Sequence, residues 1–200
     1  MTPEGVISTT AAGSGPAARL LARWWSRPTA DEVEVWASGW PTACEVAALL
    51  GLRRDGVDDV RSALSASAAE DLLAEYERLL NGPGRAPCPP YESLWRDDGP
   101  KRDQGRLMGP AAADVVRLYG ELGLQVRGDA HELPDHLAIE WEALAFALEH
   151  DATDAAATLL GEHLALWIPQ FCDAVAAETG QPFYAALASL TAAWTAVLSG

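Results

Sequence analysis

The 200-residue sequence has few cysteines and no long apolar run. Its three cysteines lie far apart and form no C-x-x-C pair, which excludes a disulfide framework and a cysteine-based zinc site and favours a reducing compartment. No stretch of about 18 apolar residues occurs, as a membrane-spanning helix would need. The N-terminal residues also lack the basic and apolar regions of a signal peptide. We therefore expect a cytoplasmic protein without stable membrane insertion.

Positive charge is also scarce. Lys and Arg number 14 against 29 Asp and Glu, and the net charge is −15. From residue 111 onward only Arg117 and Arg127 are basic, against 13 acidic residues. Because nucleic-acid binding needs a basic face, this balance argues against a nucleic-acid partner and favours a basic peptide or protein. For most of these carboxylates, a solvated acidic surface is the simpler interpretation.

Apolar residues are plentiful, at 49%, and they repeat at helical spacing in most of the chain. No alternating strand pattern is present, so the sequence predicts an all-α fold of about nine or ten helices. Residues 1–16 are small and polar and predict a flexible tail, with one helical domain over 17–200. Thr29, Thr42 and Ser67 are the expected N-caps. The eight tryptophans would serve a core, and an excess of them would also suit a peptide-binding groove.

The segment 82–110 differs from the rest because it holds six prolines and five glycines. That composition excludes a regular helix or a central strand. A connection of this length in a compact domain is usually functional or disordered. Its central stretch, PPYESLWRD, carries Tyr91 and Trp95, and these aromatic residues favour a functional loop over disorder.

A second unusual stretch, ELPDHLAIEWEALAFALEH, occupies residues 132–150. Pro134 fits the first position of a helix, and Asp135 fits the first turn, where the helix dipole favours negative charge. His136 does not fit this explanation, because the positive form of histidine is disfavoured at a helix N-terminus. A histidine held there should stay neutral.

An enzymatic interpretation of the same stretch starts from His136 and Glu140, which share a helix face at i, i+4 spacing. With His163 they could form the metal site of a helical metal-dependent hydrolase. However, the sequence contains no H-E-x-x-H, no Gly-rich phosphate loop and no Gly-x-Ser-x-Gly motif. We therefore expect no catalytic residues, no metal site and no enzyme activity, and keep the hydrolase as an alternative.

Several stretches together resemble the TorD/DmsD/NarJ family of chaperones for molybdenum-cofactor redox enzymes. ELPDHLAIEWEALAFAL resembles the family's Glu-Pro-x-Asp-His motif and the acidic-apolar helix after it, and PPYESLWRD is similar to its Tyr-Glu-Ser-aromatic loop. LMGPAAADVVRLYGELGL, EHLALWIPQF and PFYAALASLTAAW resemble three further helices. The likeness covers about residues 72–197. It departs from the family at Leu133, where proline often follows the glutamate, and at Trp141-Glu142, where a more apolar run is commoner.

The resemblance implies a TorD-like helical bundle with a hinge near residues 125–135, between an N-terminal part, 17–125, and a C-terminal part, 132–200. It implies a cytoplasmic chaperone that binds the N-terminal, often twin-arginine, leader of a molybdopterin oxidoreductase and delays export until the cofactor is inserted. The partners would be this leader and the apo catalytic subunit. The chaperone itself would need no cofactor and would be a monomer or a domain-swapped dimer. A NarJ-type assembly factor for a non-exported nitrate-reductase-like subunit is the alternative within the family.

The resemblance also implies which residues bind the leader, at the loop and at the start of the acidic-apolar helix. The expected leader-binding residues are Tyr91, Glu92, Ser93, Trp95, Pro134, Asp135, His136 and Glu140.

Overall fold

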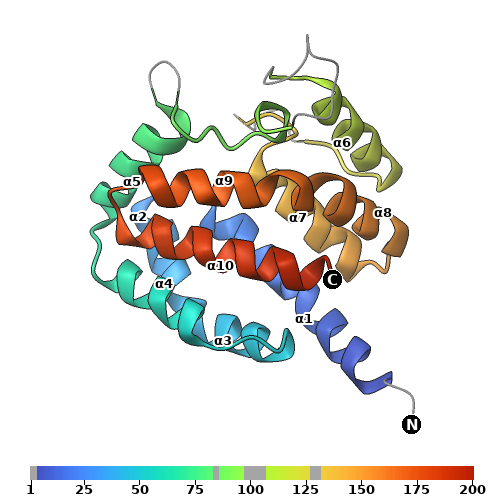
Figure 1. Cartoon of the computed structure of the whole chain (residues 1–200), viewed down its shortest axis with the longest axis horizontal. Coiled ribbons are helices and arrows are strands. Elements are labelled where there is room, and N and C mark those ends of the chain that lie inside the picture. Colours follow the sequence, from blue (N-terminus) through green and yellow to red (C-terminus); the bar gives the residue numbers. More distant parts are fainter. Residues whose placement is uncertain (1–3, 83–85, 97–106, 127–131) are drawn as a thin grey trace.

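The computed structural model describes residues 4–82, 86–96, 107–126 and 132–200, and these ranges are helical with connecting turns (Figure 1). The all-α prediction is confirmed, since the only β-type pairing in the described ranges is an isolated bridge between Tyr91 and His136. The ten α-helices of this part are α1 Glu4–Trp24, α2 Ala30–Ser38, α3 Trp40–Leu49, α4 Asp55–Ser65, α5 Ala69–Tyr76, α6 Pro110–Glu121, α7 Leu137–Glu149, α8 Thr153–Thr158, α9 Ala165–Glu178 and α10 Pro182–Leu198. Two π-helical turns, η1 Glu77–Asn81 and η3 Leu159–Leu164, extend α5 and join α8 to α9, and a 3₁₀ turn, η2, covers Glu92–Leu94.

The helices are arranged around α1, which packs along α7 and also contacts α3 and α10. α9 and α10 lie side by side, and α4 packs against the other side of α10 (Figure 1). α6 lies at the far end of the molecule from α4 and contacts η2 and η3. Within the described ranges, no helix is both long enough and apolar enough to cross a membrane.

Tryptophan builds the core rather than a surface groove. Six of the eight tryptophans are fully buried: five come from α1, α2, α7, α9 and α10, and the sixth, Trp25, directly follows α1. Trp25 also donates a hydrogen bond from Nε1 to Thr191 Oγ1 of α10, at 2.9 Å. Such side chains bury much apolar area and can still satisfy a polar atom. Of the two that remain, Trp40 is buried to 7% exposure and Trp95 is half-buried.

The N-terminal segment differs from the expected tail, because α1 begins at Glu4 and continues through Pro16. Gly13 permits close helix packing in this segment. A Cβ atom on Gly13 would lie 2.9 Å from the Leu49 Cβ atom, closer than real Cβ contacts come. The absence of a side chain there lets α1 approach α3.

Two of the three expected N-caps are wrong. Thr29 accepts a hydrogen bond from the Glu32 N–H, as expected. Thr42 lies inside α3, which begins at Trp40, and the Ser67 hydroxyl donates to the Ala63 carbonyl at the end of the preceding helix. The serine therefore terminates one helix instead of starting the next.

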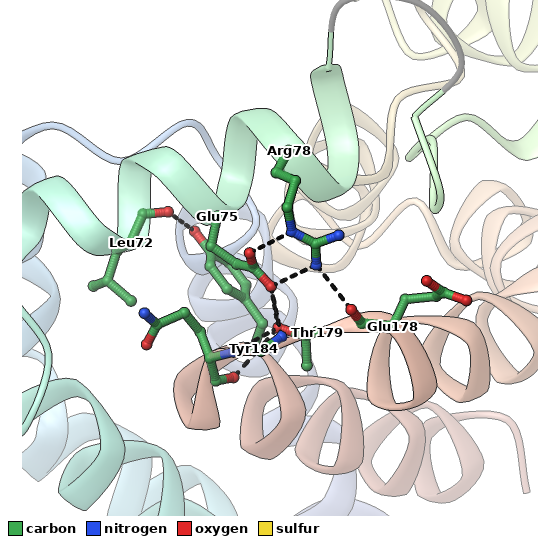
Figure 2. Close-up of polar contacts among 8 residues, drawn as sticks. Leu72, Glu75, Arg78, Glu178, Thr179 and Tyr184 are labelled. Atoms are coloured by element: carbon green, nitrogen blue, oxygen red, sulfur yellow. Dashed lines mark hydrogen bonds and ion pairs between the residues drawn. The ribbon is translucent and has the colours of Figure 1, made fainter.

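A polar cluster around Glu75 fastens α5 to the junction of α9 and α10 (Figure 2). Arg78 donates to both Glu75 oxygens at 2.7 and 2.8 Å, and Thr179 Oγ1 and the Gly180 N–H each donate to Glu75 at 2.8 Å. Arg78 also donates to the Glu178 carbonyl. These bonds, with that from Arg78 first, lower the pKa of Glu75 to about 2.

Candidate functional site

The loop at 86–96 is joined to the start of α7 by a short backbone pairing. The Glu92 N–H donates to the Asp135 carbonyl at 3.0 Å, and the Leu137 N–H donates to the Pro90 carbonyl at 2.9 Å. These two bonds flank the bridge between Tyr91 and His136. We call this pairing, formed by residues 90–93 and 135–137, the clasp. It brings the two stretches singled out in the sequence into direct contact, although about 40 residues separate them.

Asp135 is fully buried in the clasp, and its Oδ2 atom accepts a hydrogen bond from the Ser93 N–H at 3.1 Å. The carboxylate therefore satisfies a backbone donor of the 3₁₀ turn in the loop. The expectation that Pro134 and Asp135 begin a helix is wrong, because α7 begins at Leu137. The carbonyl of Pro134 instead accepts from the Tyr119 hydroxyl of α6, at 3.0 Å.

His136 is the N-cap of α7. Its Nδ1 atom accepts a hydrogen bond from the Ala138 N–H at 3.1 Å, which requires this nitrogen to be unprotonated. Burial lowers the pKa of His136 from its ordinary 6.5 to about 4, so the ring is neutral at neutral pH, as the sequence predicts. The Tyr91 ring packs edge-on against it, with centroids 5.4 Å apart.

The two loop aromatics are both half-buried and are held by hydrogen bonds. The Tyr91 hydroxyl donates to Glu132 Oε2 at 2.7 Å, and burial with this bond raises the pKa of Tyr91. Trp95 donates from Nε1 to the Pro89 carbonyl at 2.7 Å and packs edge-on against Phe171 of α9, with centroids 5.7 Å apart. Trp95 therefore anchors the loop to the core while leaving part of its ring accessible.

Glu92 is fully buried and lies between two basic groups. Arg96 Nη1 donates to Glu92 Oε1 at 2.7 Å, and His163 Nδ1 of η3 lies 2.9 Å from Glu92 Oε2. Arg96 also donates to the Glu162 carbonyl, which ties the loop to η3. A buried carboxylate is tolerated when it is paired in this way.

Glu140 is also fully buried, one turn into α7, but the described residues around it offer no cation. The indole of Trp167 donates to Glu140 Oε2 at 3.3 Å. Burial raises the pKa of Glu140 well above its ordinary value, and the nearby charge of Glu92 raises it further. The surroundings of Glu140 therefore favour its protonated form.

The clasp region leaves several buried polar atoms unpaired. Among the described residues, Ser93 Oγ, Asp135 Oδ1, His136 Nε2 and Glu140 Oε1 have no hydrogen-bond partner. Orphan atoms of this kind are uncommon in native proteins and often mark sites of function. Of the expected leader-binding residues, Tyr91, Trp95 and Pro134 are partly exposed, whereas Glu92, Ser93, Asp135, His136 and Glu140 are buried.

The metal site considered for the hydrolase alternative does not assemble. His163 Nδ1 contacts Glu92, and His136 Nδ1 caps α7. In the part of the chain that the structure describes, no group of three or more His, Cys, Asp or Glu side chains is placed to hold a metal ion.

Sequence reasoning missed three members of this site. Glu132 holds Tyr91 and lies 3.8 Å from His136 Nε2, and Arg96 and Trp167 hold the two buried glutamates. The i, i+4 spacing of Glu132 and His136 was a detectable signal. The contact of Trp167 depends on the packing of α9 on α7 and leaves no local pattern.

The fold and the clasp can be set beside known proteins. A model of the family described as nitrate reductase delta subunit matches residues 46–173. The chain belongs to this family. The resemblance to the TorD/DmsD/NarJ chaperones is thereby confirmed, and the matched residues include the whole of the clasp.

Two curated relatives illustrate the family. The chain is 28% identical over 167 residues to the Tat proofreading chaperone DmsD of Salmonella typhi, covering 82% of this chain and 74% of the relative. It is 30% identical over 126 residues to the chaperone protein TorD of Shewanella pealeana, covering 62% of this chain and 57% of the relative.

A solved structure, that of a putative redox enzyme maturation protein from Archaeoglobus fulgidus, is also similar. It superposes with a TM-score of 0.64 at 22% identity and covers 90% of this chain and 91% of its own. This likeness is one of fold, and it supports the TorD-like arrangement of the helices.

Proposed function

We propose that this family member is a cytoplasmic maturation chaperone. It binds the N-terminal, twin-arginine leader of a molybdenum-cofactor oxidoreductase subunit and holds the subunit back until the cofactor is inserted. The observation that carries the proposal is the match to the family over the residues that form the clasp, together with relatives named as Tat proofreading chaperones. The net charge of −15 suits a partner segment that carries arginines.

Burial divides the proposed site residues into two roles. Tyr91, Trp95 and Pro134 are partly exposed and can touch a leader directly. Asp135 and His136 are buried, and they act by holding the loop against the start of α7. In this proposal the leader recognises a surface that the clasp keeps in place.

Isothermal titration calorimetry tests the proposal with the leader peptides of molybdopterin oxidoreductases encoded beside this chain. We expect one of them to bind with micromolar or better affinity, and the affinity to fall as salt rises, because opposite charges contribute. If none of these leaders gives a binding signal, the proposal fails.

A second candidate function is that of an assembly factor for a non-exported, nitrate-reductase-like subunit. It is supported by the family model, which is described as nitrate reductase delta subunit. The same titration separates the two. A leader without paired arginines that binds as tightly as a twin-arginine leader would favour the assembly factor.

A further inference from the structure

Both π-helical turns in the described part of the chain contact the same loop, residues 86–96. Near the start of the loop, the Cys88 N–H donates to the Leu79 carbonyl of η1, at 2.9 Å. At the other end, Arg96 Nη1 donates to the Glu162 carbonyl of η3, at 2.7 Å. π-helical turns are rare, and they occur frequently at functional sites. Their contacts with both ends of one loop indicate that they serve the position of that loop.

The turn η3 also supplies a side chain to the loop. His163 of η3 is 5% exposed, and its Nδ1 atom lies 2.9 and 3.1 Å from the two carboxylate oxygens of Glu92. A carboxylate can only accept, so Nδ1 is the donor of this hydrogen bond. Glu92 directly follows Tyr91, precedes Trp95 by three residues, and forms one of the two clasp bonds through its backbone N–H. A shift of Glu92 would therefore move the partly exposed aromatic residues on both sides of it.

The loop meets η3 beside an open pocket of about 320 Å³, which His163 and the exposed Leu166 of α9 also line. The other charged residues that line this pocket carry both signs and are Arg96, Asp114, Arg117 and Glu162. Because positive and negative groups alternate there, the pocket favours no charged ligand. Open space on this side means that hydrogen bonds with η3, more than close packing, hold Glu92 in place.

We propose that η3 sets the position of the loop that binds the leader, and that His163 is a positioning residue which acts through Glu92. His163 does not touch the leader. Its hydrogen bond holds Glu92, and thereby Tyr91 and Trp95, in the arrangement that the leader recognises. This inference rests on the proposed function and identifies what keeps the same site in place.

The first measurement is leader affinity by fluorescence anisotropy, with a labelled leader peptide that binds the wild-type chain in the calorimetry. His163→Leu removes the donor to Glu92 and keeps a bulky side chain. Affinity should fall about fivefold, as for a loop that is in its binding-competent arrangement about a fifth of the time. His163→Asn should bind within about twofold of wild type. Its amide nitrogen is as many bonds from Cβ as Nδ1 is, so it can donate to Glu92.

Leu166→Ala is the matched control, because Leu166 lines the same pocket and is 47% exposed. It should bind the leader like wild type. A loss as large as that in His163→Leu would show that the pocket itself contacts the leader, and would overturn the positioning role. Equal losses in His163→Leu and His163→Asn would also overturn it, since lost packing would then explain both.

Arg96→Met is an independent variant that tests the proposal if His163→Leu does not fold. It keeps the aliphatic stem of Arg96 and removes the bonds to Glu92 and to the Glu162 carbonyl of η3. Affinity should again fall about fivefold, because the loop loses its second link to η3. Wild-type affinity in folded Arg96→Met would contradict the proposal. A thermal melt establishes that each variant is folded.

Amide hydrogen exchange of the unbound chain tests the position of the loop without a leader. The N–H groups of Glu92 and Ser93 bond to Asp135, so they exchange slowly only while the loop is held in the clasp. In His163→Leu they should exchange about tenfold faster, whereas the amides of α10 should exchange as in wild type. Unchanged exchange at Glu92 and Ser93 would overturn the inference. If no leader binds the wild-type chain, the proposed function fails, and this measurement still decides whether η3 positions the loop.

Discussion

Two polar clusters, around Glu75 and around Glu140, shift the pKa of a carboxyl group in opposite directions. Around Glu75, four donated hydrogen bonds satisfy both oxygens, and the pKa of the group falls to about 2. Beside the clasp, Glu140 of α7 receives one long hydrogen bond from Trp167, and its pKa is raised by burial. The first cluster joins helices through paired groups, whereas the second leaves one oxygen of a buried carboxyl group unpaired.

This difference indicates that the Glu75 cluster serves stability, whereas the clasp region serves function. Buried polar atoms without partners lower stability, so evolution has reason to replace them unless they serve function. The unpaired Asp135 Oδ1 and His136 Nε2 lie in the clasp, and Glu140 Oε1 lies one turn further along α7. The Glu75 cluster contains no such atom among those described.

Glu75→Ala should give the largest change. It removes the acceptor of four hydrogen bonds donated by Arg78, Thr179 and the Gly180 N–H. We expect the free energy of unfolding to fall by about 2–4 kcal/mol at pH 7, measured by urea denaturation. Glu121→Ala is the matched control, because its pairing with Arg117 is exposed and should contribute less than about 0.5 kcal/mol. Equal effects of the two substitutions would show that the Glu75 cluster is not a joint.

The pH dependence of the same variant follows from the lowered pKa of Glu75. A group whose folded pKa lies below its unfolded value stabilises the fold above the unfolded pKa, and this contribution is lost as pH falls through the folded pKa. The stability difference between wild type and Glu75→Ala should therefore shrink as pH falls from 4.5 to about 2.

Glu140→Gln should change stability in the opposite direction. The pKa of Glu140 is raised in the folded chain, so the unfolded chain releases this proton at lower pH and wild type loses stability as pH rises above 4.5. Glutamine does not titrate, and its amide can donate to Glu92. We expect the free energy of unfolding of Glu140→Gln to be higher than that of wild type at pH 7 and to match it near pH 4.5, measured by urea denaturation. Destabilisation at pH 7 would show that Glu140 is ionised and needed as a charge.

The sequence predicted more of the fold than of the site, for a physical reason. Helical periodicity is local, so the helix that contains Trp141 could be recognised, and Pro182 at the start of the last helix could be placed. The start of α7 could not, since its N-cap is His136, and Asp135 instead bonds to Ser93 across about 40 residues. Local rules assigned that carboxylate to the helix dipole, and a long-range contact decided otherwise.

The same limit applies to burial. Composition suggested that some tryptophans line a groove, yet only packing decides which are covered, and Trp95 alone remains half-buried. The expected tail up to Pro16 is replaced by α1 from Glu4 onward, in which the small size of Gly13 serves a close contact with α3. The sequence alone does not distinguish a glycine that makes the backbone flexible from one that lets two helices pack closely.

His136→Asn should produce an intermediate, pH-dependent effect. Asparagine is a good N-cap, so it replaces the bond from Nδ1 to the Ala138 N–H. In wild type the lowered pKa of His136 means that the unfolded chain takes up a proton as pH falls from 6.5 to about 4, and the folded chain does not. Wild type should lose stability in this window by up to ~1.4 kcal/mol per pH unit relative to the variant. Urea curves at pH 7 and pH 5 measure the difference, and parallel pH profiles for the two proteins would contradict it.

Asp135→Asn should change stability least and separates structure from recognition at the clasp. The asparagine oxygen can still accept from the Ser93 N–H, and its amide occupies the position of the unpaired Oδ1. We therefore expect the free energy of unfolding to change by less than about 1 kcal/mol. Leader affinity should nevertheless fall several-fold. The neutral asparagine forms a weaker hydrogen bond with the Ser93 N–H than the aspartate does, so the loop that presents Tyr91 and Trp95 is held less firmly. Calorimetry with the leader, beside a thermal melt, measures both quantities on one sample. Wild-type affinity in this variant would leave the clasp with a structural role only.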